Sequence, residues 1–185
     1  DELLHDALDV DVDSFRRSGA GAVTLLDRRT VTLHSDATWT ARRRTIVRIL
    51  NEHGQSETIR DIRFDREAEA ARILHGLSIR PDGSLVHLRD TAVQTEFPHQ
   101  EYPRYNRTVV RRFALPEGKP GTTLDAAYEV QRNRALFGRP FYASYPLGGV
   151  APMRNLSVEL SLPKDRTLRW EVLNDPDDSV QHASR

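Results

Sequence analysis

The chain has 185 residues, of which 38% are hydrophobic and 29% are charged, a composition typical of a globular domain large enough to bury a core. Lys and Arg together number 27, as do Asp and Glu, so no net charge favours nucleic acid or an anionic membrane as a partner. The chain has no cysteine, which excludes disulfides, thiolate metal sites and a cysteine nucleophile within it, and no apolar run approaches the roughly 18 residues of a membrane span.

The first segment carries the clearest helical pattern. Apolar residues recur at helical spacing in DELLHDALD, at Leu3, Leu4, Ala7 and Leu8. Acidic residues at positions 1 and 2 suit a helix N-terminus, and the run SGAG at 18–21 ends the pattern. Residues 1–21 are therefore predicted to form a short N-terminal helix and its lead-in.

From residue 22 onward the apolar residues recur at every second position, which indicates strands. A long strand is predicted over 38–50, where Trp39 begins an apolar face and arginines occupy the opposite face. Similar alternation occurs at 123–132, 156–162 and 168–172, and Trp170 continues the last of these apolar faces. Both tryptophans are expected in the core. Roughly ten strands joined by hairpin signals predict an all-β fold, a large antiparallel two-layer β-sandwich over 22–173, followed by a polar linker or tail over 174–185.

The stretch LSIRPDGSLVHL at 77–88 predicts a hairpin. Pro81 suits position i+1 of a type I turn, and Gly83 suits the left-handed residue of the following bulge. In this register Ile79 faces Leu85 and Leu77 faces His87, which gives the hairpin one apolar face for a core. A tight Asp-Gly type I′ turn is the alternative, although it would place Pro81, which lacks an N–H, at a hydrogen-bonded position.

Two histidines and two acids are candidates for catalysis or metal binding. His75 and His87 are predicted to lie diagonally on one sheet face, about 7–8 Å apart, but no third ligand at a suitable spacing completes a metal site. Asp125 and Glu129 share the polar face of their strand, and the arginines of 42–48 share another. We interpret these faces as solvated, with ordinary pKa values, so no metal or cofactor is expected.

The aromatic residues offer a second candidate site. Most of them lie between 97 and 145, and four are close together in LFGRPFYASY: Phe137, Phe141, Tyr142 and Tyr145. Such rings can line a groove for a glycan or a peptide. They are also ordinary core and edge residues of a sandwich, and core packing is the favoured interpretation because each ring buries a large area.

The order of several short motifs resembles one bacterial family. These motifs are the run from Ala22 to Gly54, the Pro81-Asp82-Gly83 turn, YNRTVVRRFALP at 105–116, Gly121 before TLDAAYEV, and Pro152 and Pro163 around an apolar strand. The family is the domain of unknown function that stands N-terminal to transglutaminase-like domains in exported or cell-envelope proteins, and the likeness runs over 22–173. One departure is Asp36-Ala37, where the family often turns through Asp-Gly, which puts the type of the first hairpin turn in doubt.

The resemblance implies an all-β two-layer fold, an extracytoplasmic location and a downstream transglutaminase-like domain in the same polypeptide. Any Cys-His-Asp chemistry would lie in that domain, because this chain has no cysteine. The leading hypothesis is a non-catalytic accessory or recognition domain, with no nucleic-acid partner. A glycan- or peptide-binding module using the Phe137–Tyr145 aromatics is the alternative, and an enzyme using carboxylates or the His75 and His87 pair ranks last.

Overall fold

The computed structural model describes residues 2–98, 107–135, 141–149, 151–175 and 180–184. Two short helices precede the sheets, α1 (Glu2–Leu8) and α2 (Asp13–Arg17). Neither is long and apolar enough to cross a membrane. The strands of the described residues are β1 (Ala22–Leu33), β2 (Trp39–Ile49), β3 (Ile59–Asp65), β4 (Glu69–Ile79), β5 (Leu85–His87), β6 (Val93–Glu96), β7 (Thr108–Ala114), β8 (Thr123–Arg132) and β9 (Leu156–Ser161), with 3₁₀ turns η1 (Glu52–Thr58) and η2 (Asp90–Ala92).

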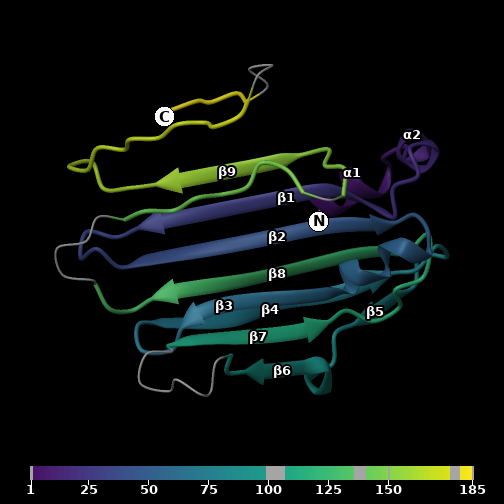
Figure 1. The fold of residues 1–185 in the computed structure, drawn as a ribbon, viewed down its shortest axis with the longest axis horizontal. Helices are drawn as coiled ribbons and strands as arrows, with labels where there is room; N and C mark the ends of the chain where they lie inside the picture. Colours follow the sequence, from purple (N-terminus) through teal and green to yellow (C-terminus); the bar gives the residue numbers. More distant parts are fainter. Residues whose placement is uncertain (1, 99–106, 136–140, 150, 176–179, 185) are drawn as a thin grey trace.

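The strands form two sheets, which confirms the all-β sandwich (Figure 1). The large sheet has the order β5-β4-β8-β2-β1-β9, and the small sheet has the order β3-β7-β6. Every named pair is antiparallel except β1 and β9, which run parallel. The long connection between β8 and β9 accounts for this exception, because a parallel neighbour cannot be reached through a tight hairpin.

An apolar core lies between the two sheets. The large sheet contributes Val47, Ile49 and Leu124, and the small sheet contributes Ile62 and Phe113, all of them fully buried. Trp39 packs against this core and is half-buried, as its place on the apolar face of β2 predicts. Alternation along each strand therefore directs one set of side chains into the space between the sheets.

The helix expected over the first 18 residues is broken into two. Between α1 and α2 the chain passes through Asp-Val-Asp-Val, residue types with low helix propensity, and the Asp11 carboxylate accepts a hydrogen bond from the Asp13 amide at 2.9 Å. Such a local side-chain bond offers the backbone an alternative to a continuous helix. Ala7 and Val12 then pack against Val23 and Ile46, on the face of β1 and β2 turned away from the small sheet.

The hairpin at 77–88 has the predicted turn and register. Leu77 pairs with His87 and Ile79 with Leu85, the Gly83 amide donates to the Arg80 carbonyl at 2.9 Å, and Gly83 has a φ of 83°. The apolar residues of the hairpin, however, do not face the small sheet, as the pairing of β4 with β8 shows.

The core-facing side of β4 carries small residues instead. Gly76 is opposite Ala126 and Ser78 is opposite Leu124, both core positions. A Cβ at Gly76 would lie 3.0 Å from side-chain atoms of Leu115 and Leu88, so the residues that follow β7 and β5 pack directly on this strand. Leu77 and Ile79 therefore lie on the outer face, where Ile79 is buried, and Leu85 is exposed.

The strand expected at 168–172 is absent, and Trp170 is not a core residue. The residues after β9 make no described ladder, and Figure 1 shows them beyond β9 at the edge of the large sheet. Trp170 is 55% exposed and stacks on the His182 ring at 4.7 Å between centroids. The alternating pattern of this segment is therefore a solvent-facing one, because no second sheet covers it.

Candidate functional site

Three carboxylates of the large sheet are fully buried: Asp27 of β1, and Asp125 and Glu129 of β8. The interpretation of Asp125 and Glu129 as part of a solvated face is wrong. A buried carboxylate is costly unless it is paired and hydrogen-bonded. Each of these three is enclosed by two cationic or hydrogen-bonding side chains from neighbouring strands.

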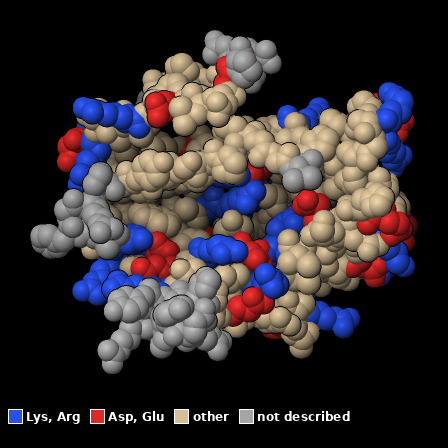
Figure 2. Space-filling model, in the orientation of Figure 1, with Lys and Arg blue, Asp and Glu red and all other residues tan. Residues whose placement is uncertain are grey.

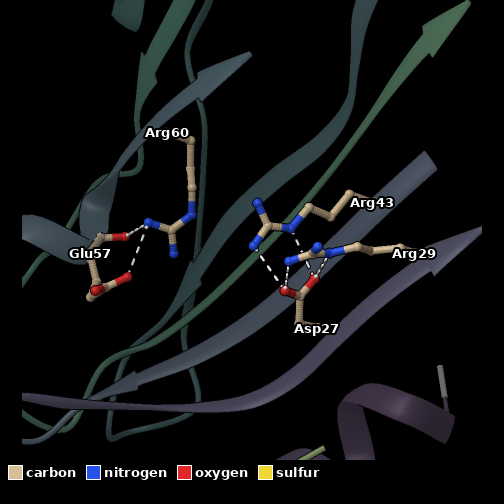
Figure 3. A network of polar contacts seen from close by, with 5 residues as sticks. All are labelled: Asp27, Arg29, Arg43, Glu57 and Arg60. Atoms are coloured by element: carbon tan, nitrogen blue, oxygen red, sulfur yellow. Dashed lines mark hydrogen bonds and ion pairs between the residues drawn. The ribbon is translucent and has the colours of Figure 1, made fainter. Parts of the chain in front are cut away.

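Asp27 lies on the inner face of the large sheet, between two arginines (Figure 3). Arg29 donates from Nε at 3.3 Å and from Nη2 at 2.7 Å, and Arg43 donates from the same two nitrogens, both at 2.9 Å. Both carboxylate oxygens therefore accept two hydrogen bonds. Alternation builds the arrangement, because Asp27 and Arg29 share a face of β1 and Arg43 lies directly opposite Arg29 on β2.

These contacts shift the ionisation of the cluster. Burial by itself would raise the pKa of Asp27, but the hydrogen bonds from Arg43 and Arg29 outweigh it and hold that pKa below its ordinary value. Burial would likewise lower the pKa of Arg43, but hydrogen bonds to Asp27 and to the Tyr128 hydroxyl raise it. The Asp27 carboxylate and the Arg43 guanidinium are therefore both stabilised in their charged forms.

A fourth charged residue, Arg60 of β3, approaches from the small sheet (Figure 3). Its Nη1 donates to the carbonyl of Glu57 and lies 3.4 Å from Glu57 Oε2. Burial lowers the pKa of Arg60, and the nearby charge of Arg43 lowers it further, while Glu57 acts in the opposite direction. Arg60 is thus held close to a second guanidinium.

These five residues, Asp27, Arg29, Arg43, Glu57 and Arg60, are called the charged hollow below. Figure 2 shows basic side chains gathered in a hollow in the middle of the face drawn, over β1 and β2, with acidic side chains beside them. The Arg43 side chain is 38% exposed and that of Arg60 is 15% exposed, so both groups reach solvent.

The predicted aromatic site divides into packing residues and one exposed ring. Phe141 meets the Trp39 ring edge-on at 6.4 Å between centroids, and the Arg29 guanidinium lies 5.3 Å from the centre of the Tyr145 ring. Burial raises the pKa of the Tyr145 hydroxyl, although the charge of Arg29 opposes this. Tyr142 is 86% exposed. Phe137 lies outside the described residues.

The outer face of the large sheet carries the other two carboxylates. Asp125 accepts from Arg44 Nε at 3.0 Å and Nη2 at 2.7 Å, and its Oδ1 lies 2.9 Å from His75 Nε2. Burial would raise the pKa of Asp125, but the hydrogen bonds from His75 and Arg44 lower it. This pair of contacts orients the His75 ring and neutralises the carboxylate.

The Glu129 carboxylate is shielded from solvent by the two arginine side chains that bind it. Arg42 Nε lies 2.6 Å from one carboxylate oxygen and Arg72 Nε lies 2.7 Å from the other, and both arginines are themselves exposed. Burial would raise the pKa of Glu129, but these two hydrogen bonds hold it below its ordinary value.

The two predicted histidines do border a common hollow. It measures about 330 Å³, lies beside the end of β5, and includes His75, His87 and Asp90 in its lining. Within the described ranges, no three His, Asp or Glu residues are placed to hold a metal ion.

Four members of the charged hollow, Asp27, Arg29, Glu57 and Arg60, were not recognised as candidate residues from the sequence. The Asp27 and Arg29 pair, two residues apart in LLDRRT, carried a local signal, since positions i and i+2 share a strand face. The approach of Arg60 from the other sheet carried none, because it depends on how the sheets pack.

Comparisons with known proteins place the chain in a family. A chain from Parabacteroides distasonis ATCC 8503, described as a "putative protease", superposes with a TM-score of 0.67 at 19% identity, covering 78% of this chain and 29% of that one. The chain thus spans less than a third of that protein, and the likeness shows the fold alone.

Two family 3a carbohydrate-binding modules from the cipA scaffoldin of Clostridium thermocellum match more weakly. One, with flanking linkers, has a TM-score of 0.35 at 14% identity over 62% of this chain and 69% of that chain. The other has a TM-score of 0.30 at 14% identity over 57% and 73%. No curated protein matches the chain. Residues 35–184 match the family described as a domain of unknown function with a solved structure, so the chain belongs to the DUF3857 family.

Proposed function

We propose that this chain is a non-catalytic accessory domain of a larger extracytoplasmic bacterial protein, and that it packs against a transglutaminase- or peptidase-like domain downstream in the same polypeptide. The observation that supports this docking most directly is a strip of exposed apolar side chains in the C-terminal part of the chain, called the apolar strip below. Its residues and exposed fractions are Val158 (40%), Leu168 (44%), Trp170 (55%) and Leu173 (70%).

Several exposed apolar side chains on one segment are typical of an interface, whereas scattered single ones are ordinary. Proteins of this fold also occur as parts of longer chains, since the Parabacteroides protein extends well beyond the matched region. The extracytoplasmic location and the transglutaminase-like neighbour rest on the motif resemblance described above.

The absence of catalysis is part of the proposal. Among the described residues the closest approach to an acid–base pair is His75 with Asp125, but Arg44 also binds that carboxylate. No described hydroxyl group lies within hydrogen-bond distance of His75, so the pair has no nucleophile to activate. Assays of the purified chain on peptide, ester and glycoside substrates should show no turnover that His75→Ala abolishes.

The docking claim is tested by hydrogen exchange in the longer natural protein and in the 185-residue chain. Amides of 156–173 should exchange more slowly in the longer protein. The double variant Leu168→Ser, Trp170→Ser should remove that protection, while Leu85→Ser, an exposed leucine near the β5 edge, should not. Equal exchange of 156–173 in both proteins would refute docking through this strip.

A binding module remains the second candidate, and the exposure of Tyr142 favours it. A ring that is 86% exposed beside two packed aromatics could stack on a sugar or a peptide side chain. Tyr142→Ala should then abolish binding on a glycan or peptide array without lowering the melting temperature. Unchanged binding would exclude this ring.

A further inference from the structure

We propose that the charged hollow is a binding site for a carboxylate, held between the guanidinium groups of Arg43 and Arg60. This inference is independent of docking through the apolar strip. It concerns the inner face of the large sheet, whereas the strip lies at and beyond the β9 edge.

The first argument is a count of charges. Three arginines, Arg29, Arg43 and Arg60, stand against two carboxylates, Asp27 and Glu57. The excess of one positive charge is held where the side chains of Arg29 and Arg60 are 9% and 15% exposed. A monoanion would balance it, and charges in such poorly hydrated places interact strongly.

The second argument is that Asp27 and Glu57 cannot neutralise the remaining positive charge. Both oxygens of Asp27 already accept from Arg29 and from Arg43. Glu57 meets Arg60 only at Nη1. All the hydrogen bonds of the Arg60 side chain to described residues come from Nη1, so Nε and Nη2 are left as donors for a ligand.

The third argument is the position of the two guanidinium groups. Figure 3 shows those of Arg43 and Arg60 beside each other, with no acidic group drawn between them. The charge of Arg43 lowers the pKa of Arg60, so the two cations are close enough to repel. Arginine forks match the planar geometry of a carboxylate, which suits two-sided recognition.

The surroundings favour an organic carboxylate over a dianion. The ring of Tyr145 lies 5.3 Å from the Arg29 guanidinium and gives the hollow an apolar wall. A phosphate dianion would bring two charges to a site that has an excess of one. The site therefore fits a singly charged carboxylate attached to a larger molecule, such as a peptide C-terminus or an acidic sugar.

The test uses the purified chain and sodium acetate as the probe, with sodium chloride at equal ionic strength as the reference. Arginine Nε–H signals in NMR spectra report binding. Loss of one charge-assisted donor should weaken acetate binding about tenfold in Arg60→Gln. Arg63→Gln removes an exposed arginine from the opposite face of the same strand and should bind like the wild type.

Two further binding experiments distinguish a peptide carboxylate from a sugar carboxylate as the ligand. A dipeptide with a free C-terminus is compared with its amide, and glucuronate is compared with glucose. At least one acid should bind tighter than its neutral partner, and only when Arg60 is present. Equal acetate affinity in wild type and Arg60→Gln, or an equal loss in Arg63→Gln, would overturn the site. If neither acid binds better than its neutral partner, the assignment to a carboxylate ligand fails, whatever the outcome for docking.

Discussion

Two regions of the sandwich bury side chains but are stabilised by different interactions. Around Phe113 the two sheets meet through a cluster of buried apolar side chains. Around Asp27 on the inner face, and around Asp125 and Glu129 on the outer face, strand neighbours meet through arginine–carboxylate contacts. A strand pattern that alternates apolar with charged residues can therefore produce burial on both of its faces.

The difference shows what burial of charge requires. Apolar packing tolerates any partner of suitable volume, whereas a buried carboxylate needs donors aimed at each oxygen. Asp27 and Asp125 meet that requirement through bidentate arginines. The apolar region should thus respond to lost volume, and the ionic regions to lost charge and to pH.

The largest effect is expected from Phe113→Ala. This ring is fully buried in the apolar core, so its removal leaves a cavity and should cost about 4 kcal/mol of the free energy of unfolding. Urea denaturation measures the change. Leu85→Ala, at an exposed site, is the control, and a similar loss in both variants would show that Phe113 does not anchor the core.

Asp27→Asn should follow. The variant keeps the volume but leaves Arg29 and Arg43 without a countercharge, which should cost about 3 kcal/mol. Asp61→Asn is the matched control. Asp61 also forms an ion pair with an arginine, Arg112, but this pair lies at the surface of the small sheet. Equal urea midpoints for Asp27→Asn and the wild type would disprove the ionic description of this region.

Lowering the pH should remove the difference in free energy of unfolding between the wild type and Asp27→Asn. Because the pKa of Asp27 is lower in the folded chain than its ordinary value of 3.8, ionised Asp27 stabilises the fold above pH 3.8, and this contribution is lost as the pH falls through the folded pKa. Asp125 and Glu129 behave in the same direction. Denaturation curves recorded between pH 7 and pH 2 should therefore converge for the two proteins, and a constant gap would contradict the shift.

Glu129→Gln should have a smaller effect than Asp27→Asn, although both carboxylates are fully buried. The partners of Glu129, Arg42 and Arg72, are exposed and regain water when the charge is lost, so about 1 kcal/mol is expected. Urea denaturation of the two variants compares these losses in the free energy of unfolding. A loss as large as that of Asp27→Asn would mean that exposure of the partners does not matter.

The turn at Gly83 gives a comparable, local effect. A Cβ there would touch nothing within 4 Å, but φ is +83°, so Gly83→Val should cost about 1 kcal/mol through backbone strain alone. Ser84→Ala should change the urea midpoint less. Equal shifts would argue against a strained left-handed residue.

Local features of the fold could be predicted from the sequence. The Pro81 and Gly83 turn fixes its own geometry, and the register of Leu77 with His87 follows from it. The face of β4 that enters the core could not, because it depends on the distant chain around Leu115 that packs on Gly76. The exposure of Trp170 has the same origin, since only tertiary structure decides which strands are covered.

The candidate site shows the same limit. Alternation predicts that Asp125 and Glu129 share a face, but a wet face and an arginine-covered face have the same sequence pattern. The pairing of β8 with β2 and β4, which brings Arg42 and Arg72 to Glu129, is not encoded locally. The position of a residue from the second sheet, such as Arg60, is the hardest to predict, because it depends on how the two sheets pack.

The most direct test of the charged hollow is a pH titration of the Asp27 carboxyl carbon by NMR in the folded chain. The arrangement of Arg29 and Arg43 predicts a midpoint below the ordinary value of 3.8, and Arg43→Gln should move that midpoint upward, because it removes the larger of the two hydrogen-bond contributions. A midpoint at or above 3.8 in the wild type, unmoved by Arg43→Gln, would contradict the claim that these arginines hold a buried, ionised Asp27.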